Sequence, residues 1–91
     1  MSIQWLFDVI EDRKTNPTEK SYTSSLFKDG LLKIAQKVGE EGTEVVVEAL
    51  AQEDQRLIEE VADLTYHTLV LLAARGLTPE DVITELEKRH K

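Results

Sequence analysis

The chain has 91 residues, 41% of them hydrophobic and 32% charged, and its formal net charge at pH 7 is -7. The length allows one domain, residues 1–91, with a small core that a second copy would help to complete. The negative charge disfavours nucleic acid as a partner, and the absence of cysteine excludes disulfides and thiolate metal sites. No signal segment opens the chain and no apolar run approaches the roughly 20 residues of a membrane span, so we expect a cytoplasmic protein without a membrane partner.

Apolar residues at helical spacing predict an all-α fold, a compact bundle of four main helices. In the first predicted helix, from about residue 2 to residue 13, apolar side chains recur along one stripe behind a capping Ser2. Asn16–Pro17 and the polar run of residues 21–25 predict a loop. Leu26–Phe27 then indicates a short helical turn before Asp29–Gly30.

The remaining three predicted helices follow without a long break. The second runs from about Leu31 to Ala51 and the third from about Asp54 to Arg75, with Gly76 as its stop. Their short connection favours an antiparallel pair. Thr78–Pro79 has the residue types of a helix start, and the fourth helix is expected to contact the core through Val82, Ile83 and Leu86.

The second half of the third predicted helix, residues 64–74, is apolar nearly all round. Such a helix must be enclosed on several sides. Because a chain this short has few elements to enclose it, this segment predicts a subunit interface and hence a homodimer.

Acidic residues form two pairs on the second and third predicted helices. Glu41 and Glu44 are three residues apart, as are Glu60 and Asp63. Residues at this spacing lie on one helix face, so an antiparallel packing can bring the two pairs together. Four carboxylates form an all-oxygen site that suits magnesium, or manganese, better than zinc. These four acids are therefore candidate metal ligands.

A solvated helix face is the alternative interpretation of the same acids, since most glutamates on helices simply face water. Two features favour the metal site. Glu41 projects next to the apolar stripe of its helix rather than opposite it. Asp63 is flanked by apolar residues, which predicts partial burial and a cationic partner. Gly39 and Gly42 inside the second helix indicate either the close approach of another helix or room for a ligand.

Cations and hydroxyl groups that could hold phosphates lie upstream of the acids. Lys33 and Lys37 precede them on the same helix, and Arg13, Ser21 and Thr23 flank or lie in the first loop. Individually, each of these residues is also an ordinary surface residue. His67 is interpreted as a core histidine with its hydrogen bonds satisfied. The sequence contains no phosphate-binding glycine loop and no nucleophile motif, so any chemistry would use water.

The acid signature resembles that of the all-helical nucleotide pyrophosphohydrolases related to MazG. Further motifs, spread over nearly the whole chain, resemble those of phosphoribosyl-ATP pyrophosphatases. These motifs are Val9-Ile10-x-x-Arg13, Ser21-Tyr22-Thr23, Leu26-Phe27 with Gly30, Ile34-x-x-Lys37-Val38-Gly39-Glu40-Glu41 and Asp63-Leu64-x-Tyr66-His67. Gly42 departs from the family pattern, where alanine is more usual, and this departure concerns helix packing rather than chemistry.

The resemblance implies a dimeric hydrolase with an all-α MazG-like fold. It would convert phosphoribosyl-ATP to phosphoribosyl-AMP and pyrophosphate, the second step of histidine biosynthesis, by attack of magnesium-activated water between the α- and β-phosphates. Glu40 would orient the water or bind a second ion. The other implied roles are metal ligation by Glu41, Glu44, Glu60 and Asp63, and phosphate binding by Arg13, Ser21, Thr23, Lys33 and Lys37.

Three alternatives remain at this point. A housecleaning hydrolase of nucleoside triphosphates, of the MazG or dUTPase type, would share the acids. An acidic helical dimerisation module would have no activity. A ferritin-like di-iron bundle would need Glu-x-x-His pairs on two helices, and the chain offers only Glu87 with His90 at its C-terminal end.

Overall fold

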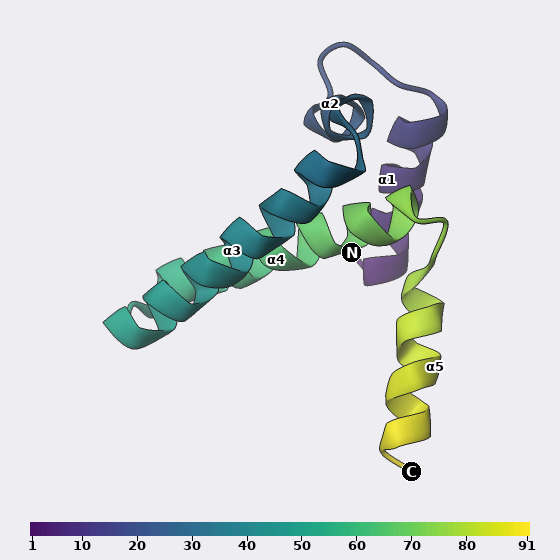
Figure 1. Cartoon of the computed structure of the whole chain (residues 1–91). Helices are drawn as coiled ribbons and strands as arrows, with labels where there is room; N and C mark the ends of the chain where they lie inside the picture. Colours follow the sequence, from purple (N-terminus) through teal and green to yellow (C-terminus); the bar gives the residue numbers. More distant parts are fainter.

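Five helices make up the computed structural model, which describes residues 1–91 throughout (Figure 1). They are α1 (Ile3–Thr15), α2 (Tyr22–Asp29), α3 (Leu31–Ala51), α4 (Asp54–Ala74) and α5 (Pro79–Arg89). The prediction of an all-α fold is confirmed, since the chain contains no strand. None of the five helices combines the length and the apolar character that crossing a membrane would need.

Three of the helix ends predicted from local sequence are confirmed. The Ser2 hydroxyl caps α1 by accepting a hydrogen bond from the Trp5 amide at 3.0 Å. Thr78 and Asp81 form a reciprocal capping box at the start of α5, with Pro79 in the first turn. Gly76 follows α4 with φ +72°, a left-handed conformation that glycine adopts without strain.

Four long helices, α1, α3, α4 and α5, correspond to the four main helices predicted, and the short α2 takes the place of the predicted loop at residues 22–25 and of the short turn at Leu26–Phe27. The polar residues at its start favour a helix because their side chains hydrogen-bond to backbone groups of the first turn. The Ser21 hydroxyl accepts from the Ser24 amide at 3.1 Å, and the Ser25 hydroxyl donates to the Tyr22 carbonyl at 2.6 Å. Burial of Leu26 then anchors this amphipathic turn against the bundle.

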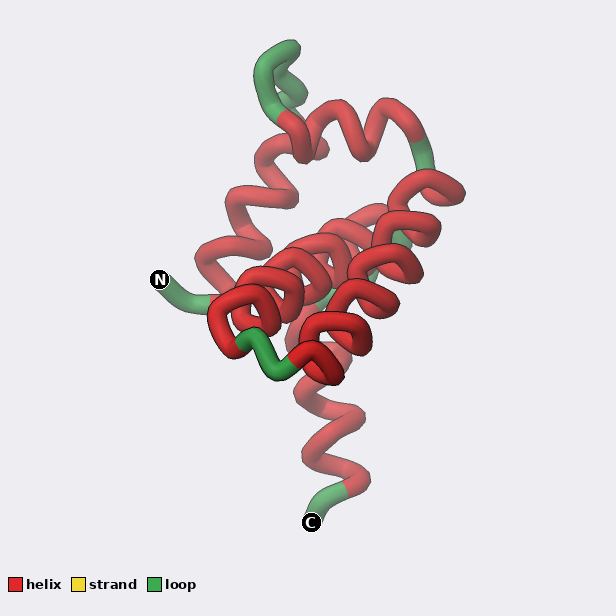
Figure 2. Tube along the Cα trace, turned by 90° about the vertical axis from the view of Figure 1, so that its left-hand side faces the viewer, coloured by secondary structure: helices red, strands yellow, loops and turns green.

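Helices α3 and α4 form the long antiparallel hairpin seen in both views (Figure 1, Figure 2). Gln52, in the left-handed conformation with φ +60°, ends α3 and turns the chain back. Near this end an Arg56 nitrogen lies 3.4 Å from an oxygen of the nearly buried Glu48 carboxylate. The ion pair joins the two helices where few apolar contacts do so.

The hydrophobic core lies at the opposite end of the hairpin, where α1 and α2 pack on it. Its seven buried residues are Phe7, Ile10, Leu26, Ile34, Leu69, Val70 and Ala73. Three of these belong to the second half of α4, where the chain's own helices bury one side of the segment. The other residues of 64–74, apart from the buried His67, are only partly buried, and the subunit interface predicted there stays a prediction.

Helix α5 projects away from the rest of the molecule, as the yellow segment of Figure 1 shows. Val82, Ile83 and Leu86, predicted to contact the core, are all exposed. Only Pro79 is buried in this helix. The sequence predicted the helix correctly, but α5 contacts mainly α1 and its apolar residues stay largely exposed.

The place of α2 in the core makes a testable prediction. Leu26→Ala removes a side chain that is 1% exposed, and we expect it to lower the free energy of unfolding by about 2–5 kcal/mol. Leu86→Ala is the matched control, because Leu86 is 51% exposed on the projecting α5. Urea unfolding followed by circular dichroism measures both. Equal effects of the two substitutions would contradict the packing of α2 described above.

Candidate metal centre

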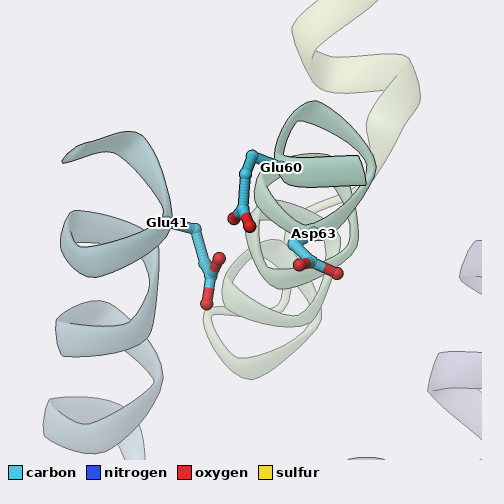
Figure 3. Close-up of side chains that lie close together, drawn as sticks. All are labelled: Glu41, Glu60 and Asp63. Atoms are coloured by element: carbon cyan, nitrogen blue, oxygen red, sulfur yellow. The ribbon is translucent and has the colours of Figure 1, made fainter. Parts of the chain in front are cut away.

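Glu41 of α3 and Glu60 and Asp63 of α4 point toward one another across the hairpin (Figure 3). One carboxylate oxygen from each lies within 4.8 Å of the other two. The spacing of three residues between Glu60 and Asp63 places both on the α4 face that meets α3. The antiparallel packing thus brings together three of the four acids predicted as metal ligands.

The dimensions of this acidic cluster fit a small hard cation. Oxygens on opposite sides of a magnesium ion are about 4.2 Å apart, since each lies about 2.1 Å from the metal. The three carboxylate oxygens lie within 4.8 Å of one another, so small side-chain rotations would bring them onto one ion. Carboxylates alone, without nitrogen or sulfur, suit magnesium or manganese. The donor set therefore fits the cation that the sequence predicts.

Glu60 shows the electrostatic consequence of the cluster. Its partial desolvation raises the pKa of the carboxyl group, and contact with Glu41 and the charges of Asp63, Glu41 and Glu44 raise it further. Each of these causes disfavours a negative charge at this position. A bound cation would oppose this rise in the pKa of Glu60, because it stabilises the charged form of all three acids.

The fourth predicted ligand, Glu44, lies one turn beyond Glu41 and outside the cluster. It is close enough for its charge to act on Glu60, but its side chain is exposed. Its role as a ligand stays a prediction. The expected partial burial of Asp63 is wrong: this residue is exposed, because no third helix covers this part of the hairpin.

Lys37 lies beside the cluster and touches both Glu40 and Glu41. Its ammonium nitrogen is 3.4 Å from a Glu40 oxygen and 3.5 Å from a Glu41 oxygen. Partial desolvation works against the ammonium charge, but Tyr22, Glu40 and Glu41 outweigh it and raise the pKa of Lys37. One lysine thus holds Glu40, the predicted catalytic residue, next to a predicted metal ligand.

A hydrogen-bonded aromatic cluster connects α2 to the acidic side of α4. His67 is buried, and its Nδ1 lies 2.8 Å from the Asp63 carbonyl oxygen, which can only accept. In the neutral ring Nδ1 therefore carries the proton, and Nε2 accepts from the Tyr22 hydroxyl at 3.0 Å. The interpretation of His67 as a satisfied core histidine is confirmed.

Tyr66 extends this cluster along α4. Its ring stacks on that of Tyr22, with centroids 6.3 Å apart, and its hydroxyl is hydrogen-bonded to Thr23. Burial raises the pKa of the Tyr66 hydroxyl, while the Thr23 hydrogen bond opposes that effect. Tyr22 itself was not among the predicted site residues. Its position in the Ser21-Tyr22-Thr23 motif was the signal that pointed to it.

The other predicted phosphate-binding residues are dispersed. Ser21 and Thr23 belong to the first turn of α2, where each is committed to a structural hydrogen bond. Lys33 is exposed on the first turn of α3. Arg13, at the end of α1, forms an ion pair with Asp12 at 2.7 Å. The structure therefore brings only Lys37 into direct contact with the acids.

Gly39 and Gly42 flank the acids on α3, and neither is approached by another helix of the chain. A Cβ atom at either position would meet nothing within 4 Å. Close packing within one chain is therefore not the reason for these glycines. The space beside them is open to a ligand or to a second copy of the chain.

Comparison with known proteins identifies relatives along almost the whole chain. A profile of the family described as phosphoribosyl-ATP pyrophosphohydrolase matches residues 4–90. The chain is 53% identical to the phosphoribosyl-ATP pyrophosphatase of Lacticaseibacillus casei over 97% of its own length and 80% of that protein. For the enzyme of Sulfolobus acidocaldarius the identity is 49%, over 98% and 94% of the two chains. The Clostridium botulinum enzyme is 48% identical over 98% and 81%.

The raised pKa of Glu60 predicts how the acidic cluster affects stability. The folded state binds a proton at Glu60 more tightly than the unfolded state, so ionised Glu60 destabilises the metal-free fold at neutral pH. This penalty disappears as the pH falls through the folded pKa. Without metal, Glu60→Gln should therefore be at least as stable as the unsubstituted chain at neutral pH, as measured by thermal unfolding in chelator.

Magnesium should raise the stability of the folded state, which ionised Glu60 lowers when no metal is bound. A ligand that binds only the folded state stabilises it by about 2.7 kcal/mol at 100 times its dissociation constant, or several degrees in melting temperature. We expect this rise for the unsubstituted chain and for the control Glu59→Gln, and its loss in Glu60→Gln. A rise that survives in Glu60→Gln would place the ion elsewhere.

Proposed function

This chain belongs to the phosphoribosyl-ATP pyrophosphohydrolase family, and we propose that it hydrolyses phosphoribosyl-ATP to phosphoribosyl-AMP and pyrophosphate. This reaction is the second step of histidine biosynthesis, and we expect it in the cytoplasm. The observation that carries the proposal is the cluster of Glu41, Glu60 and Asp63 in a chain otherwise similar to these enzymes from end to end.

In this proposal the acids of the hairpin hold magnesium, with manganese as a substitute. Glu41, Glu60 and Asp63 provide the first three ligands, and Glu44 joins them after a side-chain rotation. When bound, the cation would neutralise charge on the phosphate oxygens and make a water molecule easier to deprotonate. The raised pKa of Glu60 supports this assignment, because the cluster needs a positive charge to be fully ionised.

The chain's own residues would position the substrate and the water. The Lys37 ammonium group would bind phosphate oxygens of the triphosphate in place of the Glu40 and Glu41 oxygens that it contacts. Glu40, released from Lys37, accepts the proton of the attacking water. The water oxygen bonds to phosphorus at the α–β linkage, the bridging P–O bond breaks, and pyrophosphate leaves. Placement and charge neutralisation are the chain's main contributions.

Housecleaning hydrolysis of ordinary nucleoside triphosphates is the competing enzymatic function, since it would use the same acids. The relatives favour phosphoribosyl-ATP, because all those compared carry the name of that activity. A module without activity is disfavoured for the same reason. The di-iron alternative is disfavoured by the chain's histidines, because His67 is committed to Tyr22 and the Asp63 carbonyl and is not part of the acidic cluster.

We further infer that two copies pair through the outer face of α3. Leu32, Ala35, Gly39, Gly42, Val46 and Ala49 recur at alternating spacings of three and four residues on this helix. This is the apolar seam of a helix that packs on another helix, and the small residues would allow a close approach. Five of the six are exposed and Gly42 is half-exposed. Exposed Ile58 and Val61 of α4 extend the apolar surface beside the acids.

The activity predicted here can be measured as pyrophosphate release from phosphoribosyl-ATP. We expect release that requires magnesium, and a loss of at least about a hundredfold in kcat for Asp63→Asn, because one ligand of the ion is weakened. The fold should be retained, since Asp63 is exposed. Glu87→Gln, on the projecting α5, is the matched control and should keep full activity.

The same assay distinguishes the role of Glu40 from that of the metal ligands. Glu40→Gln should lower kcat while the magnesium-induced rise in melting temperature persists. A preference for dCTP or dUTP over phosphoribosyl-ATP would identify the housecleaning function instead. Magnesium-independent release, or none with any nucleotide, would contradict the assignment of the acidic cluster.

The homodimer predicts a mass of two chains in solution. Val46→Glu introduces a charge at the centre of the proposed seam and should shift the mass toward one chain, as measured by light scattering or sedimentation. Thr84→Glu, an exposed position on α5, introduces the same charge and should leave the mass unchanged. A dimer that tolerates Val46→Glu would show that another surface mediates pairing.

A further inference from the structure

A second cavity, which we call the α1–α2 pocket, lies on the side of α2 away from Tyr22. Its volume is about 740 Å³, within the range of small-molecule sites. The residues that line it are Arg13, Lys14, Pro17, Thr18, Glu19, Ser24, Ser25, Phe27 and Lys28. Three of these side chains are cationic and one is acidic. The pocket is therefore locally positive in a chain whose net charge is -7, and a positive pocket favours binding of an anion.

Hydrogen bonds hold the walls of the α1–α2 pocket in place. The buried Ser24 hydroxyl donates to the Arg13 carbonyl at 3.0 Å and accepts from the Thr18 amide at 3.1 Å. It thereby ties α2 both to the end of α1 and to the connecting loop. Lys14 donates to the Ala73 carbonyl at 2.7 Å, which fixes α1 against the end of α4. The fold therefore fixes the backbone around the pocket, while Lys28 and most other lining side chains are exposed.

Cationic side chains of the α1–α2 pocket keep hydrogen-bond donors that can bind a ligand. Lys28 forms no ion pair within the chain, and the Arg13 guanidinium uses one nitrogen on Asp12. A phosphate monoester carries up to two negative charges and several acceptor oxygens, so it is matched by a lysine and the free nitrogens of an arginine. The lining contains no acid cluster that could hold a metal instead.

Helix α2 lies between this pocket and Lys37, which contacts the acidic cluster. Tyr22 on one side of α2 lies beside His67 and near Lys37, whereas Ser24 and Lys28 line the pocket. The helix is short, with eight residues, and packs against both α1 and α3 (Figure 1). A ligand that bridged the pocket and Lys37 would pass around the first turn of α2.

We propose that the α1–α2 pocket binds the phosphate monoester of the substrate's phosphoribosyl group, while Lys37 and the acidic centre take the triphosphate. This inference rests on the function proposed above, because phosphoribosyl-ATP has these two phosphorylated ends. ATP has the triphosphate but not the phosphoribosyl phosphate. Lys28 and Arg13 therefore act as specificity-determining residues that distinguish the substrate from ATP itself.

Kinetics test the pocket's role. Lys28→Gln should lower kcat/KM for phosphoribosyl-ATP about tenfold, equivalent to about 1.4 kcal/mol. Its inhibition constant for ATP should be unchanged, since ATP does not reach the pocket. Lys20→Gln, which removes the same charge just outside the pocket, should change neither value. An equal effect on both nucleotides, or no effect on either, would overturn the proposal.

Direct binding of ribose 5-phosphate tests the same pocket without catalysis. In the unsubstituted chain, its titration should shift the backbone amide resonances of Ser24, Ser25 and Lys28, and Lys28→Gln should abolish the shifts. Shifts confined to Tyr22 and Lys37, or none, would overturn the proposal. So would binding in the pocket combined with unaltered phosphoribosyl-ATP kinetics in Lys28→Gln, which would indicate a separate phosphorylated ligand.

The two experiments separate this inference from the proposed function. If the chain releases no pyrophosphate from phosphoribosyl-ATP, the proposed function fails, and the ribose 5-phosphate titration still reports whether the pocket binds a phosphate monoester. If release is normal and the titration shows no binding, only the pocket's assignment fails.

Discussion

Mutual repulsion among Glu41, Glu60 and Asp63 is the constraint around which the molecule is organised. Three carboxylates whose oxygens lie within 4.8 Å of one another would separate if their helices were free to move. The antiparallel packing of α3 on α4 holds them together, and desolvation and the neighbouring acids raise the pKa of the Glu60 carboxyl group. A bound cation would relieve the repulsion among the three acids.

Helix α2 links the hydrophobic core to the acidic cluster. Leu26 anchors it in the core, while Tyr22 and Thr23 are hydrogen-bonded to His67 and Tyr66 on α4. Those two α4 residues lie one turn after Asp63, so hydrogen bonds connect α2 to the part of α4 that carries the acids. On its other side the same helix forms a wall of the cationic α1–α2 pocket. A single eight-residue element thus contacts both regions that we assign to the substrate.

A single chain buries few of its apolar residues. Only 11 of 91 residues are buried, which leaves the outer face of α3 and the apolar side of α5 in contact with water. The core is concentrated where α1 and α2 cover α4, and the acidic half of the hairpin has no such cover. The proposed pairing of two copies through α3 would protect this half, and it would explain two open glycines beside the acids.

The sequence by itself determined the helices, most of their ends and the acid pairs, because these depend on spacing and capping within a few residues. Glu60 and Asp63 share a face at any position where α4 packs. Only the tertiary structure decided which acids meet: Glu41 faces them, whereas Glu44 lies a turn away. It also decided that α2 is a helix anchored by Leu26, and that Leu69, Val70 and Ala73 of α4 are buried within the single chain. Such outcomes depend on contacts between segments far apart in the chain, which local periodicity does not encode.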